Sequence, residues 1–317
     1  MNSRVSRSSL GILLLTYTLF SSGIIAQIPE KPYENSRFFR VDSVRIHCRI
    51  WNDTLSHPRG KVLLIHGFIG STFSWRENND TLTRSGYKLV AVDLPGFGYS
   101  DRSLRVNQSQ TNRAHLLLHL LDEIDQNDTA GWNIAGHSMG GGTAEAMALM
   151  RPERIRSLTI VDGMVFIKNG NMQGAFVTLS KNKQYNKIFS SMIEEDIFTY
   201  NMIKRLFKKN YGYIPDSLVV EGYLQPLLIP GTAECVISVW SNSKEIIELK
   251  ANGFDKIPIL VIWGEKDKTI NLSRGKRFVR NVPAATLKII PDAYHDPMET
   301  HPGVFNDYLV GFLNQNN

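Results

Sequence analysis

The sequence of 317 residues contains few cysteines, no dense block of like charge and no internal repeat. Its two cysteines, Cys48 and Cys235, allow at most one internal disulfide, and they form no metal-site spacing, so the redox compartment stays open. The net charge of +6 comes from scattered lysines and arginines, without zinc-finger spacing or an RNA-binding signature. This charge pattern argues against a nucleic-acid partner.

Apolar runs long enough to span a membrane are also missing after the N-terminus. Two arginines precede the apolar run Leu10–Phe20, and small residues follow as far as Ala26. This order is typical of a secretory signal peptide, so residues 1–26 predict a secreted or periplasmic protein. The alternative is a retained segment, Ser8–Ala26, that anchors the protein and brings it into contact with a membrane.

Hydrophobic residues make up 42% of the chain and charged residues 21%, which is usual for a globular protein with an ample core. Two short alternating runs, at 38–41 and 44–50, predict an antiparallel hairpin. Continuous apolar runs predict strands that are buried on both faces, as in a parallel sheet, at residues 61–66, 87–92, 132–135, 156–161, 258–263 and 286–290. Helical patterns occur at residues 74–85, 110–124, from 139 onwards, 272–281 and 302–313. These elements predict an α/β fold with a mostly parallel sheet.

The block Met164–Gly253 interrupts this alternation, because it has helical stretches but no strong strand pattern. It is predicted to be a helical insertion on the sheet. Within it, Glu194–Lys209 has acids at its start and bases near its end, which suits either a helix that matches its own dipole or a helix that docks on anionic lipid.

The pentapeptide Gly136-His137-Ser138-Met139-Gly140 lies between a predicted strand and a predicted helix. A serine at the apex of such a turn has a strained backbone, and glycines two positions before and after it remove Cβ atoms that would collide. The following helix directs its free N–H groups toward negative charge beside the serine. Ser138 is therefore the predicted nucleophile.

A serine hydroxyl needs a base, which a carboxylate in turn orients. Histidines that follow predicted strands are the candidates for the base, since reactive groups gather at the carboxyl ends of parallel strands. His295 is favoured because it lies in the loop after the last strand. The other histidines are expected to shape a loop, to point away from the serine or to begin the last helix: His66, His137 and His301 respectively.

Asp267 follows the strand at 258–263 and is the favoured carboxylate, and Asp162 is its rival at the end of the preceding strand. Glu265 and Asp296 are weaker alternatives. The backbone N–H groups of Met139 and Phe68 are predicted to form an oxyanion hole, since one directly follows the nucleophile and the other lies in the turn after strand 61–66. No metal or cofactor is required.

His115 and His119 lie four residues apart on the predicted helix at 110–124, as a metal-binding pair would. No glutamate at the right offset and no third ligand accompanies them in the sequence. A solvated or packed helix face is therefore predicted, and no metal site.

Five motifs in order resemble the α/β-hydrolase superfamily: a strand with His66-Gly-Phe-Ile-Gly, Asp93-Leu-Pro-Gly-Phe-Gly-Tyr-Ser, Gly-His-Ser138-Met-Gly-Gly, Trp263-Gly-Glu-Lys-Asp267, and His295 before Glu299. The resemblance spans residues 38–313 apart from the insertion. It implies a triad of Ser138, Asp267 and His295, a hydrolase core at 27–163 and 254–317, and a helical cap domain at 164–253. The epoxide-hydrolase and dehalogenase branches have an aspartate nucleophile, so Ser138 argues against both.

The predicted function is a serine hydrolase that cleaves apolar carboxylic esters through an acyl-enzyme. Alternatives are a carbon–carbon bond hydrolase or lactonase with the same triad, and a hydrolase-fold receptor that holds a ligand. The expected partner is a small apolar ester or a related carbonyl compound, and the oligomeric state is open. Apolar side chains of the insertion could line the pocket: Met164, Val165, Phe166, Tyr223, Leu224 and Trp240.

Overall fold

The computed structural model describes residues 28–103, 106–125, 130–163, 182–242, 254–255 and 257–316. The predicted signal peptide and the predicted pocket residues Met164, Val165 and Phe166 lie outside these ranges. Both ends of the predicted insertion, at 164 and 253, lie outside them too. In the described part of the chain, no helix has the length and apolar character needed to cross a lipid bilayer.

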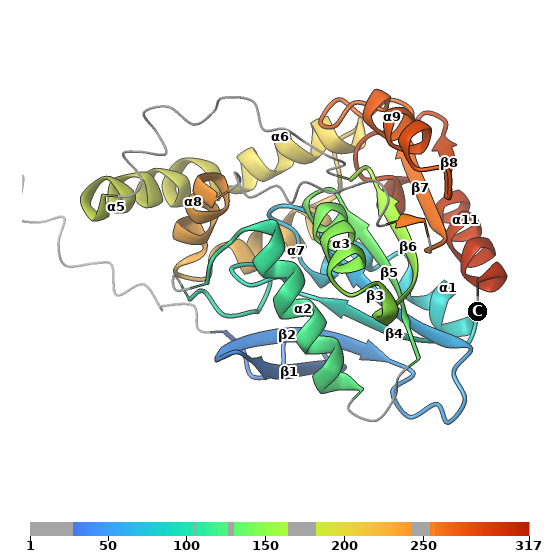
Figure 1. Cartoon of the computed structure of the whole chain (residues 1–317). Coiled ribbons are helices and arrows are strands. Elements are labelled where there is room, and N and C mark those ends of the chain that lie inside the picture. Colours follow the sequence, from blue (N-terminus) through green and yellow to red (C-terminus); the bar gives the residue numbers. More distant parts are fainter. Residues whose placement is uncertain are drawn as a thin grey trace, which may run out of the picture.

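Eight strands form one sheet in the order β1-β2-β4-β3-β5-β6-β7-β8 (Figure 1). β1 pairs with β2, and β2 with β4, in antiparallel register, whereas every later pair is parallel. The bounds are β1 Ser36–Val41, β2 Val44–Trp51, β3 Gly60–Ile65, β4 Tyr87–Val92, β5 Trp132–His137, β6 Ile155–Val161, β7 Ile259–Gly264 and β8 Ala285–Ile290. The predicted hairpin, core strands and mostly parallel α/β sheet are confirmed.

Helices cover both faces of the sheet, because the central strands present apolar side chains to each side. On β3, Leu63 and Ile65 belong to one core cluster, while Val62 and Leu64 belong to the other. The first cluster includes side chains of α2 (Gln110–Ile124), α3 (Met139–Met150) and α9 (Ser273–Asn281). The second includes side chains of α1 (Asn79–Arg84) and α11 (Pro302–Gln315).

The single helix predicted at 74–85 is wrong. The chain instead forms a 3-10 turn, η1 (Thr72–Trp75), and then the short helix α1. Between them the Asn78 amide donates hydrogen bonds to the Met298 carbonyl and to Asn306 Oδ1, both at 2.9 Å. These buried bonds fix the segment against the C-terminal helices, and no local pattern in the sequence could signal them.

Among the described residues between β6 and β7, four helices and a π-helical turn are present, and they are called the helical insert below: α5 (Lys183–Met192), η3 (Ile193–Ile197), α6 (Tyr200–Tyr211), α7 (Ser217–Leu227) and α8 (Thr232–Asn242). Figure 1 shows α5, α6 and α8 grouped beside the sheet rather than among its strands. Buried side chains of the insert, such as Ile203, Phe207 and Val220, join the first core cluster.

The charged stretch 194–209 is not one helix. It is divided at Phe198, because the Thr199 hydroxyl accepts a hydrogen bond from the Met202 N–H and so caps the start of α6. The acids lie in the π-helical turn before this cap, and the bases lie at the end of α6, where they face the negative end of the helix dipole. The stretch thus forms two helical elements, and the side chains of Ile203 and Phe207, which lie among its bases, are buried in the protein.

Candidate active site

Ser138 occupies a strained turn between β5 and α3. Its backbone has φ 51° and ψ −116°, a region that residues with a side chain rarely adopt. A Cβ atom added at Gly136 would lie 2.3 Å from the Gly140 carbonyl oxygen, and one at Gly140 would lie 2.4 Å from the His66 carbonyl oxygen. The turn that exposes the hydroxyl therefore requires glycine at both positions, because any larger residue would clash with the backbone.

Ser138, His295 and Asp267 form a continuous chain of hydrogen bonds. The Ser138 hydroxyl lies 3.1 Å from His295 Nε2, and His295 Nδ1 lies 2.8 Å from Asp267 Oδ2. Relative exposures of 8%, 4% and 4% show that solvent barely reaches the three residues. With the proton on Nδ1, the imidazole donates to the carboxylate and offers Nε2 to the hydroxyl. This arrangement can remove a proton from the serine.

Asp267 is held as a charged carboxylate. Its Oδ1 accepts hydrogen bonds from the backbone N–H groups of Thr269 at 2.7 Å and Ile270 at 3.0 Å. Burial by itself would raise the pKa of Asp267, but the hydrogen bond with His295, the charge of that ring and the backbone bonds outweigh burial and lower it. The orienting group is therefore ionised at neutral pH.

Asp162, the rival acid, lies beside this pair but has a different environment. Its Oδ1 accepts the Gly264 N–H at 2.9 Å, and its carboxyl lies within 4.8 Å of the ligand atoms of Asp267 and His295. Burial, and then the nearby charge of Asp267, raise the pKa of Asp162 well above its ordinary value. A neutral Asp162 cannot supply the negative charge that the imidazole needs.

The remaining histidine candidates occupy other positions. His66 shapes its loop as predicted, since its Nε2 accepts the Leu94 N–H at 2.9 Å and its Nδ1 donates to the Gly67 carbonyl at 2.6 Å. His301 occupies the N-cap position of α11, where its side chain makes no capping hydrogen bond. His137 does not point out of the site, in contrast to the prediction, because its ring lies 4.9 Å from the His295 ring and its Nε2 donates to the His295 carbonyl at 2.9 Å.

Two observations bear on the predicted oxyanion donors, the backbone N–H groups of Met139 and Phe68. Met139 is the first residue of α3, so the helix itself provides no acceptor for its N–H. A Cβ atom at Gly67 would lie 3.1 Å from the Ser138 Cβ, so the loop that contains Phe68 packs directly against Ser138. Among the hydrogen bonds of the described residues, none comes from either amide.

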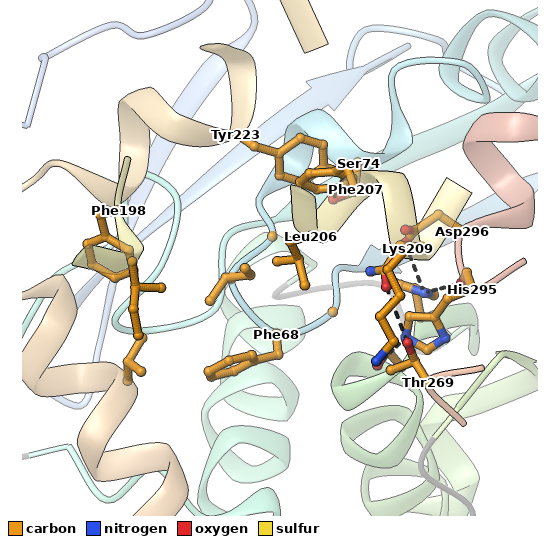
Figure 2. Close-up of a pocket in the computed structure, with 18 of the residues that line it drawn as sticks. Phe68, Ser74, Phe198, Leu206, Phe207, Lys209, Tyr223, Thr269, His295 and Asp296 are labelled. Atoms are coloured by element: carbon orange, nitrogen blue, oxygen red, sulfur yellow. Dashed lines mark hydrogen bonds and ion pairs between the residues drawn. The ribbon is translucent and has the colours of Figure 1, made fainter. Parts of the chain in front are cut away.

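A cavity of about 290 Å³ opens at Ser138 and His295 (Figure 2). The surface of the cavity is mainly apolar, and nine apolar side chains line it: Phe68, Ile69, Ile193, Ile197, Phe198, Leu206, Phe207, Val236 and Trp240. Polar groups from both the core and the insert also reach it: Ser74, Lys209, Asn210, Tyr223, Thr269 and Asp296. Tyr223 and Trp240 thus lie where the sequence places them, whereas Leu224 is not among the lining residues.

Comparison with known proteins agrees with the motifs and with the geometry. A family model for serine aminopeptidase S33 matches residues 56–300, which is more than half of the chain. The protein belongs to this family of α/β hydrolases. The family match and the fold together identify the protein as an α/β hydrolase.

Individual relatives of this hydrolase differ in the reactions that their names state. A 2-hydroxy-6-oxononadienedioate/2-hydroxy-6-oxononatrienedioate hydrolase of Cupriavidus pinatubonensis is 27% identical, over 88% of this chain and 95% of its own. An uncharacterized hydrolase of Bacillus subtilis, YugF, is 23% identical, over 87% and 97%. A solved structure of a probable hydrolytic enzyme from Pseudomonas aeruginosa PAO1 has a TM-score of 0.72 at 19% identity, over 91% and 98%. The comparisons establish a hydrolase but not the bond that it cleaves.

The helical insert of this hydrolase contacts the loops that carry His295 and Asp267. The carbonyl of Asn210, near the end of α6, accepts the His295 backbone N–H at 2.9 Å. Its side-chain oxygen accepts the Thr269 hydroxyl at 3.2 Å. No pattern in the sequence indicates this role of Asn210, because the contact joins segments far apart in the chain.

A buried carboxylate also connects the insert to the core. Glu299, in α10 (Pro297–Thr300), pairs with Arg76 and accepts the hydroxyls of Tyr211 and Tyr223. The Tyr223 hydroxyl also lies 2.9 Å from Ser74 Oγ. Burial, followed by the charge of Glu299, raises the pKa of Tyr223 well above its ordinary value, so the phenol keeps its proton as a donor. The two tyrosines therefore fix α6 and α7 beside the catalytic loops.

Cys48 and Cys235 are both free and buried in the hydrolase. Cys48 lies on β2 and Cys235 on α8. Burial raises the pKa of each thiol, which disfavours the reactive thiolate.

Proposed function

We propose that this hydrolase cleaves carboxylic esters of moderate to apolar character through an acyl-enzyme. The observation that supports the proposal most directly is the hydrogen-bonded series Ser138–His295–Asp267, which opens into a mainly apolar cavity. A cavity of about 290 Å³ suits a small ester whose acyl or alcohol group packs against aromatic and aliphatic side chains.

In the proposed mechanism, His295 Nε2 takes the hydroxyl proton while Ser138 Oγ attacks the carbonyl carbon of the ester. The amides of Phe68 and Met139 hold the oxyanion of the tetrahedral intermediate. His295 then returns its proton to the departing alcohol, which leaves an acyl group on Ser138. Water repeats the sequence, and the charge of Asp267 stabilises the imidazolium in both halves.

A carbon–carbon bond hydrolase is the second candidate. The stated activity of the Cupriavidus pinatubonensis and Escherichia coli relatives favours it, at 25–27% identity. The dioate substrates in their names carry two carboxylates. Among the described lining residues, Lys209 supplies the single ammonium or guanidinium group. A neutral ester needs no such partners, so the lining favours the ester.

A substrate panel separates these candidates. p-Nitrophenyl esters of graded acyl length, a ring-fission dienone, a lactone and an aminoacyl p-nitroanilide should be assayed side by side. We expect the highest kcat/KM on an ester, with a maximum at a short or medium chain because the cavity volume is about 290 Å³. If the dienone is turned over with a kcat/KM well above that of every ester, the carbon–carbon assignment replaces ours.

A fluorophosphonate probe tests the nucleophile itself. The probe should label Ser138 in the peptide map, and Ser138→Ala should abolish labelling and lower turnover by several orders of magnitude. Correctly folded protein that takes no label would instead support a ligand-binding receptor on the hydrolase fold.

We also propose that residues 1–26 direct the chain into an export pathway and are removed, with a retained anchor as the alternative. The basic, apolar and small-residue order supports this proposal. N-terminal sequencing of the protein from its native host tests it. A mature chain that begins near residue 24 or 27 is expected, and full-length protein in the soluble cell fraction would contradict both alternatives.

A further inference from the structure

Three potential metal ligands converge on the protein surface, outside the candidate active site. His115 and His119 lie one turn apart on α2, and Asp42 lies in the turn between β1 and β2. Asp42 Oδ2 is 3.2 Å from His119 Nδ1 and 3.7 Å from His115 Nδ1. One ligand atom from each residue lies within 4.8 Å of the others. The hairpin thus supplies the third ligand that the sequence did not reveal.

These separations fit a shared ion, and the longer of them is too long for a hydrogen bond. An ion bonded to imidazole nitrogen at about 2.0 Å and to carboxylate oxygen at about 2.1 Å, with a tetrahedral angle, holds the two atoms about 3.3 Å apart. The observed 3.2 and 3.7 Å lie around this value. A hydrogen bond, in contrast, needs a nitrogen–oxygen distance nearer 2.9 Å, and 3.7 Å is outside its range.

We propose that His115, His119 and Asp42 bind one divalent ion of the zinc, nickel and copper class. Two imidazoles and one carboxylate suit these borderline ions, whereas magnesium and calcium prefer oxygen ligands alone. Side-chain exposures of 49% for His115, 42% for His119 and 50% for Asp42 leave the remaining coordination positions open to water. An ion bound here joins the first hairpin to α2.

The backbone on both sides of the site limits how far the ligands must move. Asp42 and Ser43 have positive φ angles of 46° and 69°, which form a tight two-residue hairpin turn and fix the position of the Asp42 backbone. The two histidines have helical spacing, and their ring centroids are 4.1 Å apart. Rotation of exposed side chains is therefore enough to complete the site.

Calorimetric titration of zinc chloride into the tag-free, EDTA-treated full chain tests the proposal. We expect one saturable site per chain. His115→Ala, His119→Ala and Asp42→Asn should each weaken binding at least tenfold. The matched control is His57→Ala, which removes an exposed histidine outside the cluster and should leave the affinity unchanged.

A spectroscopic measurement identifies the ligands directly. Copper(II) bound to the parent protein should show electron paramagnetic resonance splitting from two nitrogen ligands, and His115→Ala should show one. Melting temperatures in EDTA should be equal for the parent and the variants, since all three side chains are exposed. Absence of saturable zinc binding at millimolar concentration, or equal binding by the His115→Ala/His119→Ala double variant, would overturn the proposal.

Discussion

Exchange of the acid behind His295 for its neutral amide is the sharpest test of the proposed mechanism. In Asp267→Asn, the side-chain oxygen can keep the hydrogen bonds from Thr269 and Ile270 only at the Oδ1 position. The amide nitrogen then faces His295 Nδ1 and donates to it. The imidazole proton must move to Nε2, where it points at Ser138 and prevents removal of the hydroxyl proton.

A wrong tautomer of this kind lowers kcat by about 10⁴-fold in a serine triad. At 1.36 kcal/mol for each tenfold change, the loss corresponds to about 5 kcal/mol of transition-state stabilisation. Asp162→Asn is the matched control, because Asp162 is buried beside the same pair and burial already keeps it neutral. Its amide replaces a neutral carboxyl, so kcat should fall less than tenfold.

Steady-state kinetics on the best ester of the panel measures both variants, and circular dichroism and melting temperature confirm that each is folded. A larger loss for Asp162→Asn than for Asp267→Asn would refute the assignment of the acid. Equal, small losses in both would show that His295 does not depend on a carboxylate.

Four further substitutions test packing and buried charge. The carboxyl oxygens of Glu145 have no hydrogen-bond partner in the described part of the chain, and burial raises the pKa of this carboxyl well above its ordinary value. The folded state therefore keeps a proton that the unfolded state releases above about pH 4.3. Stability should therefore fall with rising pH by about 1.4 kcal/mol per unit between these two pKa values, and urea unfolding of Glu145→Gln at pH 5 and 7 should lack this component. Gly136→Ala should abolish esterase activity through its clash, while Gly311→Ala, which meets nothing within 4 Å, should raise stability by about 0.5–1 kcal/mol in the same unfolding assay. Tyr223→Phe removes a donor to the charged Glu299 and should cost about 1.5–3 kcal/mol of unfolding free energy, and a loss near zero would show that the bond does not fasten the insert.

The sheet could be predicted because each of its core strands is a local run of apolar residues in the sequence. A run such as Val62 to Ile65 is apolar at every position, since both faces of β3 are buried. The candidate catalytic residues could be predicted from the sequence for a related reason. Ser138, Asp267 and His295 each follow a strand, and the ends of parallel strands meet at one edge of the sheet.

Contacts between distant segments could not be predicted. Asn210 approaches His295 through the main chain, so no side-chain type marks it. Asp42 approaches His115 and His119 only because the first hairpin packs beside α2. The end of the helical turn at Phe198 could not be predicted, because the start of α6 depends on a single cap, the Thr199 hydroxyl.

Hydrogen bonds join the helical insert to the backbone of His295 and to α10, which follows it. Asn210 holds the backbone of His295, and Tyr223 both lines the cavity and binds Glu299, four residues after that histidine. Changes that reshape the cavity therefore also act on the position of the base. We expect substitutions in the insert to change kcat together with KM, rather than KM alone.

His137 gives the last test, because it contacts the base without taking part in proton transfer. Burial, then the nearby His295 ring, lowers the pKa of His137 to about 3, so the ring is neutral throughout the range in which a serine hydrolase works. Its Nε2–H donates to the His295 carbonyl at 2.9 Å. His137→Phe leaves that buried carbonyl without this donor, at a cost of about 1–3 kcal/mol, and kcat should fall about 10- to 100-fold.

The pH profile separates a positioning role from a catalytic one. If His137 only holds the His295 backbone, the acid limb of kcat/KM keeps its inflection in His137→Phe, because the group that titrates there is still the base. His137→Gln retains an N–H donor and should recover part of the lost kcat. Loss of the acid inflection in His137→Phe would mean that His137, rather than His295, is the group that titrates in the working range.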